Sequence, residues 1–177
     1  MKKSFTLTEL LVAIGLTSLV SGAILGIFLS GIWAQRRILA TQEVLDQASY
    51  VLEYMGRQLR LARKDDLDGK SCLHGYKTNC EVSEGGRKIS FKNFDGKCHS
   101  FYFQDNKIVE KKEDFFNPLP LTSVKINYLK FKVSGETQQD TFQPRITISF
   151  EAETKEKNPT KLKFQTTISQ RNLDVVY

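Results

Sequence analysis

The sequence predicts an α+β fold in which one long N-terminal helix packs, through its second half, on an antiparallel β-sheet. Three observations lead to this prediction. An uncharged apolar stretch runs from Leu10 to Ala34, an amphipathic stretch with helical spacing follows it as far as Lys64, and short segments of alternating apolar and polar residues fill the chain after residue 87. We place the segment boundaries at 5–35, 36–64, 65–86 and 87–177.

The apolar first half of the helix has the length of a membrane span. The stretch from Leu10 to Ala34 contains no Asp, Glu, Lys or Arg. At about 1.5 Å per residue it would measure roughly 37 Å as a helix, enough to cross a hydrocarbon core of about 30 Å. Trp33 suits the membrane interface, and Arg36 and Arg37 follow it. We therefore expect residues 5–35 to span a membrane.

The second half of the helix has one apolar face. Apolar residues recur at spacings of three and four, and Leu45 and Leu52 widen their stripe: Val44, Ala48, Val51, Met55, Leu59 and Ala62. The first proline is Pro118, so no residue before it forces a break. We predict one continuous helix from Phe5 to Lys64.

Segment 65–86 is rich in Gly, Asp, Ser and Asn and predicts an irregular loop, and strands are expected after it. The predicted strands are 87–94, 98–103, 108–112, 124–133, 144–153 and 161–170, with a loop around Pro118 and Pro120. The apolar parity changes between Tyr128 and Leu129, which predicts a β-bulge there. Each strand has one apolar face, and the amphipathic half of the helix is the only candidate to cover it.

Charge and side-chain chemistry narrow the function. The 177 residues carry a net charge of +6, spread along the chain, which favours an ordinary solvated surface. The cluster Arg57, Arg60, Arg63 and Lys64 is the one place where DNA, a lesser alternative as partner, would bind. His74 and His99 lack any accompanying catalytic or metal-ligating pattern, so we expect no enzyme, no metal and no cofactor.

The three cysteines are Cys72, Cys80 and Cys98. Outside the cytoplasm, three cysteines predict one disulfide and one remaining thiol. We favour a bond between Cys72 and Cys80, which are close in sequence. Cys98 is then a buried thiol in a strand, or it is instead the true partner of one of the other two.

Glu9 stands at the threshold of the apolar stretch and needs an explanation. A carboxylate in a membrane helix costs on the order of 2.5–3.5 kcal/mol at the centre and less near the end. A signal peptide or a plain signal anchor has no use for an acidic residue there. However, a short basic leader (MKKS), an aromatic residue, TLTE and a long uncharged helix together resemble the class III signal of type IV pilins and pseudopilins.

This resemblance implies how the chain is processed and where it goes. Residues 1–4 would be a leader, removed by prepilin peptidase between Ser4 and Phe5, although the family usually has Gly where this chain has Ser4. Phe5 would be N-methylated, and Glu9 would pair with the N-terminus of a neighbouring subunit. The implied product is a minor pilin or pseudopilin with a pilin-like fold, anchored in the bacterial cytoplasmic membrane by one helix. Its C-terminal domain would lie outside, before assembly into a periplasmic or extracellular filament.

The resemblance also implies partners: other pilin or pseudopilin subunits, the inner-membrane assembly platform, and lipid before assembly. Within the apolar stretch a stripe of small residues at spacing four would permit close helix packing: Ser18, Gly22, Gly26 and Ser30. The alternative is ordinary small residues in a membrane span. The alternative for the whole protein is an unprocessed, signal-anchored extracytoplasmic binding module that keeps residues 1–4.

Overall fold

The computed structural model describes residues 6–63, 72–73, 78–135, 143–156 and 159–170. It contains one helix, α1 (Leu7–Arg60), that runs without interruption through both the apolar and the amphipathic stretch. This confirms the predicted continuous helix within the described residues, although α1 ends a few residues before Lys64. Arg57 and Arg60 occupy its last turn, where cations interact favourably with the helix dipole. The chain divides into two compact units inside this helix, Met1–Thr41 and Gln42–Tyr177.

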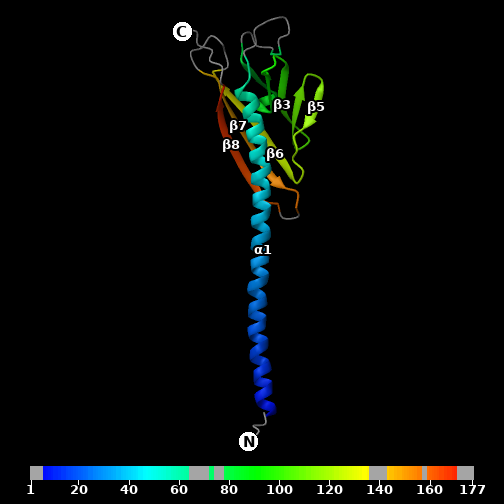
Figure 1. Cartoon of the computed structure of the whole chain (residues 1–177), viewed down its shortest axis with the longest axis vertical. Coiled ribbons are helices and arrows are strands. Elements are labelled where there is room, and N and C mark those ends of the chain that lie inside the picture. The colour runs from blue at the N-terminus through cyan, green and yellow to red at the C-terminus, as the bar shows by residue number, and fades with distance from the viewer. Residues whose placement is uncertain (1–5, 64–71, 74–77, 136–142, 157–158, 171–177) are drawn as a thin grey trace. The chain divides into compact units, whose positions relative to one another are not determined.

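Two antiparallel sheets follow the helix in the second unit (Figure 1). The five-stranded sheet has the order β1 (Cys80–Ser83), β2 (Lys88–Lys92), β3 (Cys98–Gln104), β4 (Lys107–Lys112) and β5 (Phe115–Pro118). The three-stranded sheet has the order β6 (Val124–Ser134), β7 (Arg145–Thr154) and β8 (Lys161–Ser169). Every neighbouring pair is a simple antiparallel connection in chain order, which confirms the α+β class.

The predicted single sheet is therefore two sheets, and two short strands were not predicted. β1 and a 3₁₀ turn, η1 (Glu84–Gly86), lie within the segment expected to be an irregular loop. β5 lies within the expected proline loop. Both strands have four residues and β5 ends in Pro118, which is tolerated because β5 is an edge strand. A strand of four residues contains too few alternating apolar and polar positions to be recognised in the sequence.

The turn between β3 and β4 is a two-residue hairpin with a clear sequence cause. Gln104 pairs with Lys107, and Asp105 and Asn106 have φ values of 49° and 59°. These left-handed values are those of a type I′ turn, in which Asp and Asn are among the best-tolerated non-glycine residues. The turn holds β3 and β4 in the register on which the polar network described below depends.

One hydrophobic core joins α1 to both sheets. The predicted helix stripe is confirmed: its six residues, from Val44 to Ala62, are all at most 1% exposed. Leu45 is 42% exposed, so the buried stripe is narrower on that side than predicted. The sheets contribute apolar side chains from one face each, among them Phe91, Phe101, Ile126, Phe131, Ile148 and Phe150. The amphipathic half of the helix thus covers the apolar faces of the strands, as expected.

The predicted bulge exists and lies slightly earlier than expected. The register between β6 and β7 shifts between Ile126 and Tyr128, which leaves Asn127 as the extra residue. The shift allows Ile126 and Leu129, of opposite parity, to be buried on the same side. The Asn127 amide donates hydrogen bonds to Glu151 (2.8 Å) and Glu153 (2.9 Å), which fixes the bulge to the neighbouring strand.

Candidate functional site

The helix start at Thr6–Glu9 is a capping box. The Thr6 hydroxyl accepts a hydrogen bond from the Glu9 backbone N–H (3.3 Å), and the Glu9 carboxylate accepts one from the Thr6 N–H (3.4 Å). The Thr6 hydroxyl also donates to the same carboxylate oxygen (3.3 Å). Two backbone donors at the helix end are satisfied reciprocally, a pattern encoded by Thr-x-x-Glu. Ser4 and Phe5, the predicted processing residues, lie outside the described residues.

The capping box is a role for Glu9 that the sequence analysis missed, although TLTE carries the signal. The carboxylate lies in the first turn, where the positive end of the helix dipole favours an anion. It therefore has partners within one chain as well as the intersubunit role implied by the resemblance. Any test of Glu9 has to separate these two roles.

The apolar part of α1 offers a large uncovered surface in the first unit. The large apolar side chains from Leu7 to Leu29 are each more than half exposed. Within the described residues, α1 is the one helix long and apolar enough to cross a membrane. A single such helix is consistent with a membrane anchor or a signal segment.

The small-residue stripe at Ser18, Gly22, Gly26 and Ser30 lies on this part of α1. A Cβ atom placed on Gly22 or Gly26 would meet nothing within 4 Å, so the backbone there is open to close approach. The Ser18 hydroxyl donates to the Ile14 carbonyl and the Ser30 hydroxyl to the Ile27 carbonyl, each at 2.8 Å. Both hydroxyls are thus satisfied inside the helix, which suits an apolar environment.

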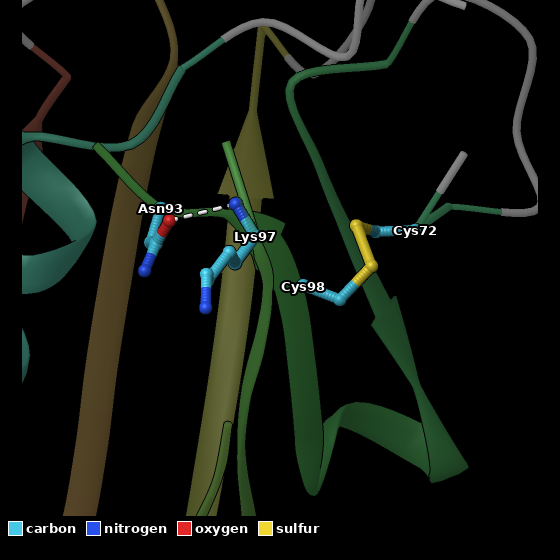
Figure 2. The surroundings of a disulfide bond; sticks show 4 residues. All are labelled: Cys72, Asn93, Lys97 and Cys98. Carbon is cyan, nitrogen blue, oxygen red and sulfur yellow. Dashed lines mark hydrogen bonds between the residues drawn. A yellow bond between two sulfur atoms is a disulfide. The ribbon is translucent and has the colours of Figure 1, made fainter. Parts of the chain in front are cut away.

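The favoured disulfide between Cys72 and Cys80 is wrong: Cys72 is bonded to Cys98, with a Cα–Cα distance of 5.3 Å (Figure 2). The reason is strand parity. Cys80 pairs with Phe91 and, like it, is 0% exposed in the core. Cys98 pairs with Lys92 on the opposite face of the sheet and is exposed. The bond between residues close in sequence would require Cys80 to leave the core.

The basic cluster proposed for DNA is only partly available. The Arg57 guanidinium forms an ion pair with Glu53 at 3.0 Å. The Arg63 guanidinium lies 4.6 Å from the ring centroid of Phe94, a cation–π contact. Lys64 lies outside the described residues. Two of the four cations therefore have partners within the chain, which weakens the cluster as a nucleic-acid surface.

A buried polar network, which the sequence analysis missed, joins α1 to the five-stranded sheet. Glu110 on β4 is 4% exposed, and its carboxylate accepts hydrogen bonds from the Tyr54 hydroxyl (2.6 Å) and from His99 Nε2 (2.7 Å). The Lys112 ammonium lies 3.1 Å from its other oxygen and donates to the Tyr54 hydroxyl at 3.0 Å. The Glu110 carboxylate thus has partners on β3 (His99), on β4 (Lys112) and on α1 (Tyr54).

Burial sets the titration of this network. It lowers the pKa of His99 below its ordinary value, and the hydrogen bond to Glu110 opposes that effect only in part. The neutral imidazole donates from Nε2 to Glu110, while Nδ1 is buried without a hydrogen-bond partner among the described residues. Burial and the Glu110 carboxylate raise the pKa of Tyr54. Each member of such a network has lost its hydration, so a shift that breaks one of its hydrogen bonds leaves a buried polar group unpaired. The network therefore favours one packing geometry.

No group of three or more His, Cys, Asp or Glu suited to a metal ion occurs among the described residues. Neither a family model, nor a curated protein, nor a solved structure matches this chain.

Proposed function

We propose that this protein is a structural subunit, a minor pilin or pseudopilin, of a type IV pilus or type II secretion-like filament. The observation that carries the proposal is the position of Glu9, which lies shortly after the basic leader and at the entry of an uncharged helix. The architecture supports it, because the same helix continues into an amphipathic half that packs on antiparallel strands. No enzymatic step is needed for this role.

Before assembly, the apolar half of α1 anchors the subunit in the cytoplasmic membrane, with the strands outside. Prepilin peptidase removes residues 1–4, and the new N-terminus at Phe5 is methylated. Before assembly, the Glu9 carboxylate is stabilised within its own chain. Thr6 donates hydrogen bonds to it, and the positive end of the helix dipole favours its charge near the membrane boundary. The cost of placing Glu9 at the entry of an apolar helix is thereby reduced.

On assembly, the helix leaves lipid and packs among the helices of neighbouring subunits. Glu9 then pairs with the protonated N-terminus of Phe5 in an adjacent subunit. In a dry bundle the pair neutralises two charges that are costly when separate, whereas a neighbour in the wrong register leaves both unpaired. The pair therefore selects the register of the growing filament.

The N-terminus of the mature protein tests the proposal directly. The full-length chain is expressed with a prepilin peptidase, extracted from membranes and analysed by intact mass and N-terminal sequencing. We expect a chain that starts at N-methylated Phe5. A chain that retains residues 1–4 contradicts the proposal and supports the signal-anchored binding module.

The residue before the cut provides a matched control. Ser4→Gly introduces the glycine that the family usually has before the cut. We expect this variant to be processed at least as completely as the natural chain. If neither chain is cut, while an established prepilin in the same cells is cut, the peptidase is active and the proposal fails.

A further inference from the structure

The outer face of the five-stranded sheet, opposite the core, carries a polar pocket built from three adjacent strands. Strand register places Ser90 on β2, Ser100 on β3 and Lys111 on β4 in one row across this face. Lys88 lies two residues before Ser90, on the same face of β2. These four residues line a pocket of about 160 Å³, which we call the outer pocket.

The donors of the outer pocket are not used elsewhere. The hydroxyls of Ser90 and Ser100 and the ammonium of Lys88 make no hydrogen bond or ion pair within the described part of the chain. Ser100 is only 6% exposed as a residue, and it contributes to the lining of the outer pocket. The Lys111 ammonium lies 5.0 Å from the Phe116 ring centroid, a contact that leaves its hydrogen-bond donors available.

The charge of the outer pocket favours an anion. Within the described part of the chain, two lysines line it, Lys88 on β2 and Lys111 on β4. Among the described residues that line it, Glu113 supplies the one carboxylate, and that carboxylate is paired with the Lys97 ammonium at 3.4 Å. Two ammonium groups and two hydroxyls match an oxyanion, which offers several acceptor lone pairs.

The size and the walls of the outer pocket restrict the ligand. Pockets for drug-sized molecules measure about 300–1,000 Å³, so a volume of 160 Å³ suits a single carboxylate or phosphate group rather than a nucleotide. One wall is the disulfide between Cys72 and Cys98, which stands at the start of β3 (Figure 2). This covalent link limits how far the wall can move to admit something larger.

We infer that the outer pocket binds a small oxyanion through the ammonium groups of Lys88 and Lys111 and the hydroxyls of Ser90 and Ser100. The inference does not depend on the proposed filament role. A ligand at free concentration L that binds only the folded chain raises the free energy of unfolding by RT ln(1 + L/Kd), so the shift in thermal unfolding with anion concentration gives Kd, which is the half-saturating concentration.

The test uses the full-length chain in detergent, with inorganic phosphate or acetate added against chloride at constant ionic strength. We expect the unfolding midpoint to rise with this logarithmic dependence for at least one of the two anions, and the more effective anion identifies the tetrahedral or the planar ligand. The double variant Lys88→Met and Lys111→Met is expected to raise the half-saturating concentration at least tenfold. The control variant Lys107→Met and Lys132→Met removes the same charge from β4 and β6 outside the pocket and is expected to leave it unchanged.

Two results overturn the inference. One is the lack of a logarithmic rise in the unfolding midpoint with either anion. The other is an equal weakening in both double variants, which would mean a general charge effect. Ser100→Ala keeps every charge and removes one hydroxyl from the pocket lining, so it remains informative if the double variant fails to fold. Its half-saturating concentration should rise several-fold, and an unchanged value contradicts the pocket.

Discussion

His99 is a residue whose proton uptake is coupled to folding. Because burial lowers its pKa, the unfolded chain binds a proton at a higher pH than the folded chain does. The stability that neutral His99 contributes is therefore present at pH values above the unfolded pKa of about 6.5 and is lost as the pH falls below it. The buried Nδ1 has no hydrogen-bond partner among the described residues, so protonation of the ring gains no compensating hydrogen bond from them.

We therefore predict that the unfolding midpoint of the full-length chain falls between about pH 7 and pH 5, and that His99→Gln flattens this part of the profile. Glutamine retains a donor for Glu110 but does not titrate. His74→Gln, at the other histidine of the sequence, is the matched control and should keep the natural slope. Parallel profiles for the natural chain and His99→Gln would contradict the assignment.

Glu153 makes the stability of the fold depend on pH in a second, more acidic pH range. Its carboxylate accepts a hydrogen bond from Asn127 and forms ion pairs with Lys125 and Lys161. The hydrogen bond to Asn127, followed by that to Lys125, lowers the pKa of Glu153 to about 2. A lowered carboxyl pKa stabilises the fold above the unfolded value of about 4.3, and the effect disappears as the pH falls towards about 2.

Glu153→Gln should accordingly reduce stability at neutral pH and remove part of the acid-induced loss between about pH 4.5 and pH 2. Thermal unfolding at a series of pH values measures both effects. Asp46→Asn changes an exposed carboxylate on the helix and should leave the acid profile nearly unchanged. If both variants show the same profile, the cluster around Asn127 does not control acid stability.

At the scale of elements, Tyr54 attaches α1 to the five-stranded sheet. Its hydroxyl donates to the buried Glu110 carboxylate, and its ring meets Phe101 edge-on at 6.3 Å. Tyr54→Phe keeps the ring contact and removes a hydrogen bond to a charged group, a loss of about 1.5–3 kcal/mol. Tyr50→Phe is the control, because Tyr50 stacks on Tyr54 but is 54% exposed. Denaturant unfolding should separate the two variants, and equal stability would show that the hydroxyl does not hold the helix.

The Cys72–Cys98 disulfide joins the chain before β1 to the start of β3, a sequence separation of 26 residues. A closed loop of this length stabilises a fold by roughly 2–4 kcal/mol. Cys72→Ser and Cys98→Ser should each lose about this amount under oxidising conditions and neither should do so in reductant. Peptide mapping of the natural chain should recover Cys72 linked to Cys98, and a linked Cys72–Cys80 peptide would contradict the register described here.

The sequence predicted best those elements whose side chains alternate over many residues. The stripe from Val44 to Ala62 and the long strands β6, β7 and β8 have enough repeats to reveal their buried face. β1 and β5 have four residues each, too few for a period to emerge. The correct disulfide required knowing that Cys80 and Cys98 lie on opposite faces of one sheet, and this depends on β1, which was not predicted.

In the candidate site too, the sequence carries the signal for local contacts but not for contacts that depend on strand register. Thr6 and Glu9 form a local contact, so TLTE contained the signal for the capping box. The network of Tyr54, His99 and Glu110 brings together residues up to 56 positions apart, and no local pattern connects them. The outer pocket likewise depends on the register of three strands. Local chemistry was readable, whereas chemistry assembled by register was not.

At the scale of the whole molecule, the proposed assembly depends on whether Glu9 acts through its charge or only through the capping box. Both roles use the same carboxylate, so removal of the side chain does not distinguish them. Glutamine at the third helical position still accepts a hydrogen bond from the capping residue's N–H, and it carries no charge. Glu9→Gln therefore preserves the cap and removes the partner for a neighbouring N-terminus. Thr6→Ala does the reverse, because it loses the capping hydroxyl and retains the carboxylate.

The Glu9 and Thr6 variants should differ in their incorporation into filaments. Glu9→Gln, Glu9→Ala and Glu9→Lys should all insert into the membrane at natural levels, yet their recovery in sheared filaments should fall by tenfold or more, since each leaves a neighbouring N-terminus unpaired in a dry bundle. Thr6→Ala, which costs the helix only about 0.5–2 kcal/mol, should still be incorporated. Immunoblots of membrane and filament fractions measure both steps. Natural recovery of Glu9→Gln together with loss of Thr6→Ala would mean that Glu9 serves the helix end alone, and the charge pair between subunits would be excluded.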